Sequence, residues 1–409
     1  MKKISFLLVL FTAGILILIL TQFYFKYKGV LPAVLPPAKI PAKEPTSMIT
    51  NDLGLTIPEG FKMAIFAQNL KNPRVLTLDE NGTLLVSIPQ EGKVVALPDK
   101  NNDGKADETV TVVEDLERPH GIQIKSQRLY VAQTKSILRF DYDRKIHKAS
   151  NPTKIVDLPA GGRHFTRTIK FAPDGKLYVS IGSTCDVCVE DDQRLASIIK
   201  VDPQSGQYQL IARGLRNSVF FVFNDQTQEI WATEMGRDFL GDDLPPDELN
   251  IVREGKDYGW PYCYGNRVHD TNFDQKVYIQ TAPPLPCGQT EPPVYGISAH
   301  SAPLGLVFIP GSSNQNQLKF PFPESWQGDL LVAYHGSWNR SIPIGYKIVR
   351  LKVEGAKVLQ EEDFVNGFLK GSQTQGRPVD LLFDKNGILY ISDDKAGVIY
   401  RILYESWPN

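Results

Sequence analysis

The sequence predicts an all-β protein, a six-bladed β-propeller preceded by an N-terminal transmembrane or signal helix. The chain of 409 residues contains 32 glycines and 29 prolines, which indicate many turns, and β-branched and aromatic residues between the turns favour strands. No long amphipathic helical period follows the N-terminus. One motif recurs along the chain: an apolar strand, a polar turn often written D-x-x-G, and a second strand of the type L-Y-V-S. Regular repetition of such hairpins is typical of propellers.

The N-terminal segment, residues 1–28, is predicted to be a signal-anchor or a signal peptide. Two lysines precede an apolar run from Ile4 to Leu20, which is close to the ~20 apolar residues with which a helix crosses a bilayer. The length of this run and the lack of an A-x-A-like cleavage site favour an uncleaved anchor over a cleaved signal. Both alternatives predict an extracytoplasmic protein, periplasmic or at the cell surface, and an anchor would also attach it to the membrane.

Residues 29–51 are predicted to form a proline-rich linker, and residues 52–409 the propeller, which would carry any catalytic site. The linker includes the sequence LPAVLPPAKIPAKEP. Proline-rich segments of this kind are stiff and extended, so we expect the linker to hold the propeller away from the membrane surface.

Six copies of the hairpin motif set the number of blades. The second strands of the copies begin near Leu84, Leu129, Leu177, Ile230, Leu330 and Leu389. Most of these starts are about 45–60 residues apart, and a four-stranded blade takes about 40–50 residues. One longer step of about 100 residues predicts an insertion, roughly from Asp238 to His300. A parallel β-solenoid is the competing fold, but its repeats would be shorter.

The composition excludes some classes of partner and limits the chemistry of the cysteines. The net charge is −1 and basic residues are scattered along the chain, which argues against a nucleic-acid partner. The four cysteines are Cys185, Cys188, Cys263 and Cys287. An even number in an exported protein favours two disulfides, and a zinc site is the alternative because the first pair forms a C-x-x-C motif.

Four histidines lie at strand boundaries beside glycine or proline, in equivalent places of four blades: His120, His164, His300 and His335. Ligands of propellers bind on connecting loops at one mouth of the central channel, so we expect these side chains to converge there. A single histidine of this kind is more often a hydrogen-bonded structural residue. As a set they predict a site, and four converging imidazoles could also bind a transition metal.

Six arginines accompany these histidines near the blade ends: Arg163, Arg167, Arg216, Arg237, Arg340 and Arg377. An arginine binds a carboxylate through two parallel hydrogen bonds. The arginines therefore predict an anionic ligand with several carboxylates, and salt bridges on the propeller rim are the alternative.

A further candidate site is the segment DKNNDGKADE. Asp99, Asn101 and Asp103 alternate as oxygen donors, Gly104 allows a turn, and Asp107 could complete the set. The pattern resembles the start of a calcium loop but lacks a glutamate at the twelfth position. We expect a structural Ca²⁺ site here, with a polar hairpin turn as the alternative.

Five segments occur in the order of a known family: HFTRTIKFAPDGKLYVSIGS, GLRNSVFFVF, GDDLPPDELNIVREGKDYGWPYC, AHSAPLGLVF and RPVDLLFDKNG. Over roughly Leu55 to Ile402 the chain resembles the glucose/sorbosone dehydrogenases, nearest the sorbosone-dehydrogenase-like branch. The resemblance implies a six-bladed propeller with pyrroloquinoline quinone (PQQ) at the channel mouth and Ca²⁺ polarising it. It also implies oxidation of an aldose or a sorbosone-like aldehyde by hydride transfer to the quinone, followed by electron transfer to an external acceptor.

The resemblance also implies roles for individual residues. His164 occupies the place of the general base, which accepts the proton of the C1 hydroxyl. Arg216 and Asn217 match a cofactor-binding pair, in which Arg216 stabilises negative charge on the quinone oxygen. Gly236 and Arg237 occupy the turn whose main-chain carbonyls hold Ca²⁺.

Other positions match the family less closely. Arg377 matches an arginine that binds a cofactor carboxylate, and His300 is a further candidate for cofactor contact. The family's cofactor lysine has no clear match, so His335 or Arg340 would take its place. Met235 stands where soluble glucose dehydrogenases have a glutamine. Ser183 stands near the place of the aspartate that orients the base.

Two other functions compete with the dehydrogenase. A non-catalytic extracytoplasmic propeller that binds a carbohydrate or a protein would not need a base within hydrogen-bond reach of its ligand. A metal-dependent hydrolase such as a lactonase would need carboxylates and asparagines around one cation. The predicted blade ends carry histidines and arginines instead, which counts against the hydrolase.

Overall fold

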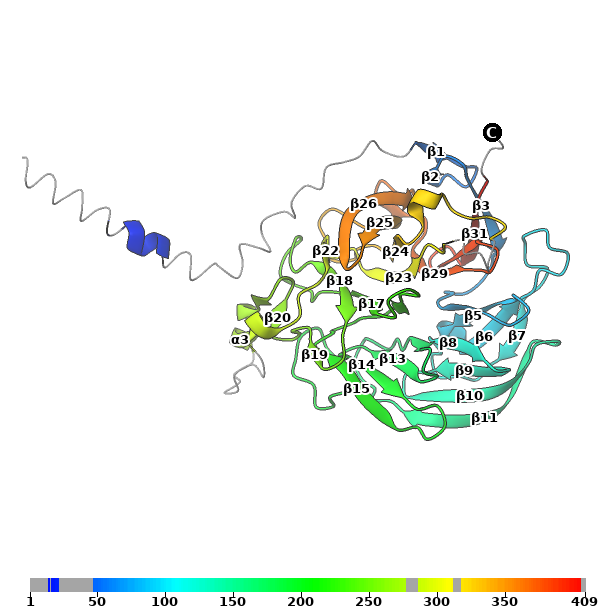
Figure 1. Ribbon diagram of the computed structural model, residues 1–409, viewed down its shortest axis with the longest axis horizontal. Coiled ribbons are helices and arrows are strands. Elements are labelled where there is room, and N and C mark those ends of the chain that lie inside the picture. Colours follow the sequence, from blue (N-terminus) through cyan, green and yellow to red (C-terminus); the bar gives the residue numbers. More distant parts are fainter. Residues whose placement is uncertain (1–13, 15, 22–46, 277–285, 312–317, 406–409) are drawn as a thin grey trace, which may run out of the picture.

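The computed structural model describes residues 14, 16–21, 47–276, 286–311 and 318–405. Six antiparallel sheets of four main strands follow one another around a closed ring (Figure 1), which confirms the predicted six-bladed propeller. The first blade contains β4 (Leu76–Leu78), β5 (Leu84–Ile88), β6 (Lys93–Leu97) and β7 (Val110–Val113). The second blade contains β8 (Ile122–Lys125), β9 (Arg128–Ala132), β10 (Ser136–Asp143) and β11 (Lys148–Asp157).

The remaining blades repeat this plan. The third blade contains β12 (Ile169–Phe171), β13 (Leu177–Ile181), β14 (Ser197–Val201) and β15 (Tyr208–Arg213). The fourth blade contains β16 (Phe221–Phe223), β17 (Ile230–Glu234), β18 (Asp247–Val252) and β22 (Tyr295–Ile297). The fifth blade contains β23 (Pro303–Phe308), β24 (Leu330–Tyr334), β25 (Lys347–Glu354) and β26 (Lys357–Val365). The sixth blade contains β29 (Pro378–Phe383), β30 (Leu389–Asp393), β31 (Val398–Tyr404) and β3 (Phe61–Ala67).

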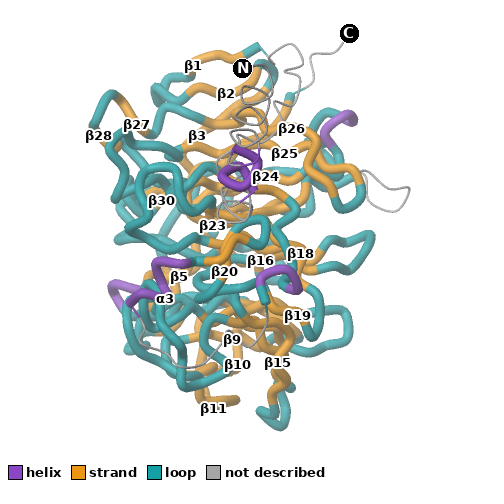
Figure 2. Tube along the Cα trace, turned by 90° about the vertical axis from the view of Figure 1, so that its left-hand side faces the viewer, coloured by secondary structure: helices purple, strands orange, loops and turns teal. Residues whose placement is uncertain are grey.

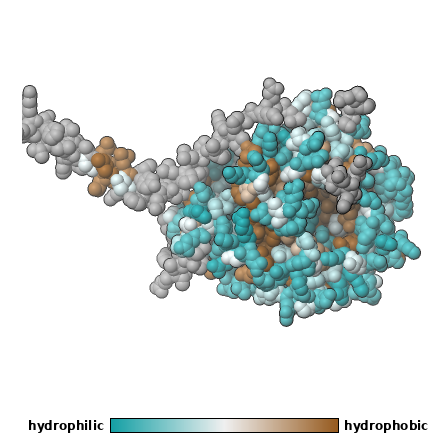
Figure 3. All heavy atoms as spheres, in the orientation of Figure 1, coloured by the Kyte–Doolittle hydropathy of each residue, from teal (hydrophilic) through white to brown (hydrophobic). Residues whose placement is uncertain are grey.

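The second strands of the blades are largely buried. All residues of β5, β17, β24 and β30 are buried. Both faces of a blade pack against neighbouring blades, so these strands are apolar on both sides and do not alternate in polarity as half-exposed strands do. The outer surface is largely hydrophilic in the view of Figure 3.

The repeated D-x-x-G turn has a physical cause that is the same in the first and last blades. Asp79 accepts hydrogen bonds from the amides of Asn81 and Thr83 at 2.9 and 2.8 Å. Asp384 accepts the corresponding bonds from Asn386 and Ile388. The turn glycines have φ of 92° and 87°, where a residue with a Cβ is strained. The aspartate thus closes the turn and the glycine permits it.

The ring is closed by the N-terminal strand of the propeller. β3 pairs with β31 from Phe61↔Tyr404 to Ala67↔Ile399, so the sixth blade combines strands from both ends of the chain. The Phe61 ring lies 4.8–5.2 Å from the rings of Phe322, Trp326 and Phe364. This aromatic cluster ties the closing strand to the fifth blade.

The structure corrects the predicted boundary between linker and propeller. β1 (Met48–Thr50) pairs with β2 (Thr56–Pro58), so regular structure begins before residue 52. The hairpin lies at the edge of the ring beside β3 (Figures 1 and 2). The prolines that predict a spacer end at Pro45, which explains the difference.

Most of the predicted membrane segment and of the linker lies outside the described residues, which near the N-terminus are 14 and 16–21. No helix in the described part of the chain has the length and hydrophobicity needed to span a bilayer. The predictions of an anchor and of an extracytoplasmic location therefore stay predictions.

The predicted insertion from Asp238 to His300 is too long, because it includes β18 and β22 of the fourth blade. Asp247, Glu248 and Asn250 in β18 are polar but buried, and such a strand does not show the apolar pattern of its equivalents. The inserted residues lie between β18 and β22. They include β19 (Lys256–Asp257), β20 (Cys263–Tyr264), β21 (Val268–His269) and α3 (Thr271–Lys276).

The four cysteines form two disulfides, as the even count predicts. Cys185 pairs with Cys188 and Cys263 pairs with Cys287, with Cα–Cα distances of 6.1 and 5.7 Å. The zinc alternative is therefore wrong, because no thiolate is available to bind the metal.

Substitution of Phe61 tests how far the closing strand stabilises the fold. Phe61→Ala should lower the free energy of unfolding by about 3–5 kcal/mol, because it leaves a cavity in a buried aromatic cluster. Lys62→Ala is the matched control on the same strand, and it should change stability by less than about 0.5 kcal/mol since Lys62 is exposed. Urea denaturation measures both, and similar values for the two variants would contradict this account.

Candidate active site

The loops at one edge of the blades carry the polar residues of the site. The end of each second strand and the start of each first strand lie at the same edge, because these strands are antiparallel neighbours. Ser183 follows β13 and Gly236 follows β17, while His164 precedes β12, Asn217 precedes β16 and His300 precedes β23. Residues far apart in sequence are thereby brought to one mouth of the ring.

A cavity of about 250 Å³ opens at this edge. Among the predicted site residues it is lined by His164, Arg216, Asn217, Gly236 and His300. Further lining residues are Arg163, Asp186, Met235, Asp238, Asp247, Ala302, Trp338 and Asn339. The cavity thus combines the third, fourth and fifth blades.

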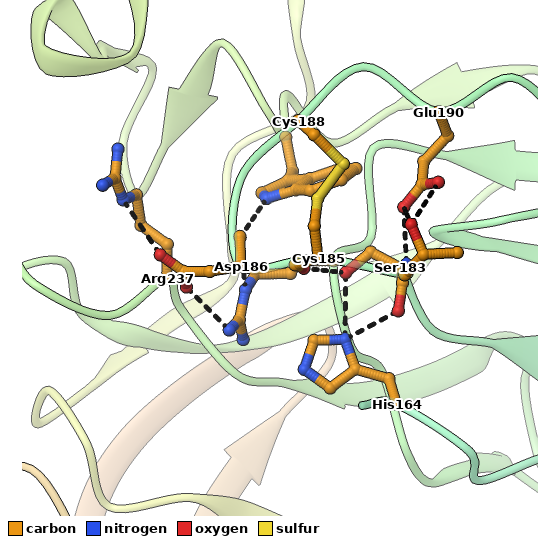
Figure 4. The surroundings of a disulfide bond; sticks show 10 residues. His164, Ser183, Cys185, Asp186, Cys188, Glu190 and Arg237 are labelled. Carbon is orange, nitrogen blue, oxygen red and sulfur yellow. Dashed lines mark hydrogen bonds and ion pairs between the residues drawn. A yellow bond between two sulfur atoms is a disulfide. The ribbon is translucent and has the colours of Figure 1, made fainter. Parts of the chain in front are cut away.

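His164 is held by its Nδ1 atom (Figure 4). Nδ1 lies 2.9 Å from both the carbonyl oxygen and the hydroxyl oxygen of Ser183. That hydroxyl donates its own hydrogen to the carbonyl of Cys185 at 2.7 Å. Both Ser183 oxygens must therefore accept, and Nδ1 must carry the proton. Nε2 then has a free lone pair and no protein partner among the described residues.

The environment keeps the His164 ring neutral. Burial lowers its pKa to about 4, and the nearby charge of Arg216 acts in the same direction, while the hydrogen bond to Ser183 opposes them. A neutral imidazole with an unoccupied Nε2 is the protonation state that a general base needs.

Arg216 is the best-anchored cation of the cavity. Its side chain is buried, Nη2 lies 2.9 Å from Asp186 Oδ1, and Nε donates to the Asp186 carbonyl at 2.8 Å. Nη1 donates to the Met235 carbonyl at 3.2 Å. Asp186 also accepts a bond from the Asp238 amide. The guanidinium is therefore fixed in orientation before any ligand binds.

The Cys185–Cys188 disulfide closes the loop that supports both His164 and Arg216. Ser183, which contacts His164, and Asp186, which holds Arg216, lie on either side of Cys185 (Figure 4). The sequence signal for Asp186 was the C-x-x-C motif that contains it, but spacing alone does not show that this aspartate pairs with an arginine 30 residues away.

Asn217, Gly236 and Asp247 form the floor of the cavity. The Asn217 Oδ1 atom is buried without a hydrogen-bond partner. Asp247 accepts the amides of Gly236 and Ala302, each at 2.9 Å. Burial nevertheless raises the pKa of Asp247 to about 7. An unsatisfied amide oxygen and a desolvated carboxyl are polar groups that a ligand or a cation would satisfy.

The predicted site residues His335 and Arg377 lie together but do not line this cavity. His335 Nε2 lies 3.0 Å from Asp394, and its Nδ1 is 3.3 Å from Arg377 Nη1. Arg74 also pairs with Asp394 at 2.7 Å. Burial lowers the pKa of His335. Burial alone would raise the pKa of Asp394, but His335 and Arg74 together hold it well below its usual range.

Arg340 and Arg237 also have protein partners outside this cavity. Arg340 bonds the carbonyl of Asp242 and pairs with Asp243 at 2.7 Å, so it joins the loop after β24 to the loop after β17. Arg237 pairs with Asp270 at 2.6 Å, and both side chains are buried. Only the main chain of Arg237 is left to fill the predicted Ca²⁺ role, which stays a prediction.

The predicted calcium segment is a self-bonded loop. Asp99 accepts the amides of Asp103 and Gly104, Asn101 accepts that of Asp103, and Asp107 accepts that of Lys100. These bonds are those of a polar turn, and they leave the structural Ca²⁺ site a prediction. The segment lines a different cavity from that of His164.

The predicted convergence of four histidines holds for two of them. His164 and His300 line the cavity, whereas His335 lies with Asp394 and His120 is fully buried near Thr168. Within the described ranges, no set of three histidines gathers its ring nitrogens closely enough to bind one metal ion. The structure therefore gives no support to the transition-metal alternative.

Comparison with known proteins agrees with this architecture. An uncharacterized protein of Borreliella burgdorferi is 31% identical over 369 residues, covering 86% of this chain and 91% of that protein. A pyrroloquinoline quinone-dependent pyranose dehydrogenase of Coprinopsis cinerea is 24% identical over 87% of this chain. The match covers only 55% of the length of that fungal protein.

Solved structures show the same fold. The holo form of the pyranose dehydrogenase PQQ domain from Coprinopsis cinerea superimposes with a TM-score of 0.69 and 22% identity, covering 85% of this chain and 97% of that domain. A calcium structure of a Trichoderma reesei family AA12 enzyme gives a TM-score of 0.69 at 20% identity, over 90% and 99% of the two chains. The resemblance to PQQ-dependent sugar dehydrogenases is thus confirmed. The family model described as TrAA12-like matches residues 55–405, and the chain belongs to this family.

Proposed function

We propose that the protein is a PQQ-dependent dehydrogenase that oxidises an aldose sugar or a sorbosone-like aldehyde. The observation that carries the proposal is His164, a neutral imidazole with a free Nε2 at the edge of a polar cavity. A purely binding propeller has no need of such a base. The name of the fungal relative from Coprinopsis cinerea, a PQQ-dependent pyranose dehydrogenase, supports the same chemistry.

The residues of the cavity fit PQQ, which carries carboxylates and quinone oxygens. Arg216 offers a fixed positive charge, and the orphaned Asn217 Oδ1 marks an amide that has no protein partner for its oxygen. The Asn217 amide group makes only a 3.5 Å contact to the Met235 sulfur, so it is free to donate to the cofactor. These residues would hold the quinone at the floor of the cavity.

A calcium ion would be held beside them. The carbonyl oxygens of Gly236 and Arg237 accept no hydrogen bond from the described residues, and Asp247 lies next to Gly236. Carbonyl and carboxylate oxygens are the ligands that Ca²⁺ prefers. The bound cofactor would supply a hydride acceptor, which no protein side chain can be.

The chain's own residues then handle the proton and the charge. His164 Nε2 accepts the proton of the sugar C1 hydroxyl, while Ser183 fixes the tautomer through Nδ1. Loss of that proton would favour departure of the C1 hydride to the bound cofactor, which would leave C1 as a carbonyl and would pass two electrons to an external acceptor. Arg216 is oriented by Asp186, so it would stabilise negative charge on a bound quinone without having to reorganise.

Reconstitution tests this function directly. The propeller should show a spectral change on addition of PQQ and Ca²⁺, and it should then reduce a dye with an aldose. His164→Gln should bind PQQ as the natural protein does but lower kcat by about 10²–10⁴-fold, because it removes the base. His147→Gln, in the turn between β10 and β11, is the control and should keep full activity. Full activity of the His164 variant would reject the assignment.

The pH dependence gives an independent test. Because burial and Arg216 lower the pKa of His164 to about 4, the basic form is present from pH 5 upward. With Ca²⁺ at saturation, so that Asp247 stays ionised, the acidic limb of kcat/KM should therefore fall near pH 4 and be flat between about pH 5 and 7. An ordinary imidazole would give an acidic limb near 6.5, and that result would contradict the proposed environment of the base.

The N-terminal segment is proposed to anchor the enzyme outside the cytoplasm. The proposal rests on the apolar run from Ile4 to Leu20 and agrees with the two disulfides, which persist in oxidising compartments. The full chain should stay with the membrane fraction after an alkaline carbonate wash and be cleaved by protease added to the outside of cells. Recovery in the soluble cytoplasmic fraction would overturn this location.

A further inference from the structure

The cavity has a buried floor and an exposed rim. Arg216, Asn217 and Asp247 at the floor are 5%, 7% and 2% exposed. Arg163 and Trp338 line the same cavity but are exposed, Trp338 by 63%. A cofactor held by the floor residues leaves the rim facing the next molecule to enter, which is the substrate. Rim residues are therefore candidates for substrate selection.

Arg163 is a charged residue of the cavity whose side chain has no partner among the described residues. Arg216 is paired with Asp186 and Asp238, and Asp247 accepts two amides. The Arg163 guanidinium makes no ion pair or hydrogen bond with any described residue. The positive charge of Arg163 nevertheless acts inside the cavity, because this charge is one of the causes that lower the pKa of His164. An unpaired guanidinium at a cavity edge is a ready site for an anion.

Arg163 is the neighbour in sequence of the proposed base. Arg163 directly precedes the base His164, and consecutive Cα atoms are only about 3.8 Å apart. Both side chains line the same cavity. A hydroxyl at Nε2 and an anionic group at Arg163 would be two substituents of one small molecule, as on a single sugar ring.

The rim also offers an apolar surface. The Trp338 ring packs edge-to-face against Phe239, with centroids 6.4 Å apart, and Phe239 is 66% exposed. The contact orients the indole and leaves it open to solvent. An exposed indole with its edge supported is suited to the apolar C–H face of a pyranose.

We propose that the rim selects sugars that carry a negatively charged group, a carboxylate or a phosphate. Arg163 binds that group and Trp338 contacts the ring, while C1 is oxidised as above and the anionic group is unchanged. The inference rests on the proposed dehydrogenase function and adds the class of substrate. Both anions share the chemistry that Arg163 recognises, so the experiment includes both.

The test compares kcat/KM for glucose, glucuronate and glucose 6-phosphate in the reconstituted enzyme. At least one anionic sugar should be preferred over glucose, and Arg163→Gln should reduce that preference about tenfold or more, mainly through KM. Arg163→Lys should keep part of this preference, because lysine retains the positive charge but lacks the planar guanidinium that can form two parallel hydrogen bonds. Arg144→Gln, an exposed arginine in the turn between β10 and β11, is the matched control. The ratio to glucose cancels any effect of Arg163 on the base.

A binding measurement separates the two levels of the proposal. Binding of glucuronate or glucose 6-phosphate should quench the fluorescence of Trp338, and Arg163→Gln should raise the dissociation constant from this titration about tenfold. The Trp338→Phe variant should lose the fluorescence change, which shows that the change comes from Trp338. Binding without dye reduction would keep the anionic rim and reject the dehydrogenase. Turnover of glucose with no preference for either anion, or a preference untouched by Arg163→Gln, would overturn the rim inference and leave the dehydrogenase standing.

Discussion

The pairing of β3 with β31 is the interaction on which the rest of the structure depends. It closes six sheets into a ring with strands from both ends of the propeller, and only a closed ring buries both faces of every blade. Closure also fixes the loops at one edge, so that His164, Arg216 and Asp247 from two different blades meet at one cavity. The cavity is therefore a consequence of the ring rather than of any local motif.

Within that cavity a neutral imidazole, His164, lies in the field of a fixed cation, Arg216. One short loop, closed by the Cys185–Cys188 disulfide, sets both, since Ser183 orients His164 and Asp186 orients Arg216. Burial keeps the imidazole uncharged, while the ion pair keeps the guanidinium charged in a desolvated place. Such preorganised groups need no rearrangement when charge develops during the reaction.

The repeats predicted the fold because the hairpins share a signal: a largely buried second strand and, in the first and last blades, an aspartate-glycine turn, as at Asp79 and Gly82. Motif order also led to His164, Arg216 and Asn217, which share the cavity. Asp186 and Asp247 were not identified, because their importance lies in tertiary partners. Arg340 was predicted to bind the cofactor, but in the structure it joins two loops, a role that arginine spacing does not distinguish.

If the cofactor lies on the floor of this cavity, it faces His164. A crystal structure of the propeller soaked with PQQ and Ca²⁺ tests this placement most directly. The account predicts the quinone within hydrogen-bond reach of Arg216 and Asn217, the ion at the carbonyls of Gly236 and Arg237, and His164 Nε2 facing the space above the quinone. A cofactor bound elsewhere on the propeller, or a cavity that stays without one at saturating PQQ, would contradict it.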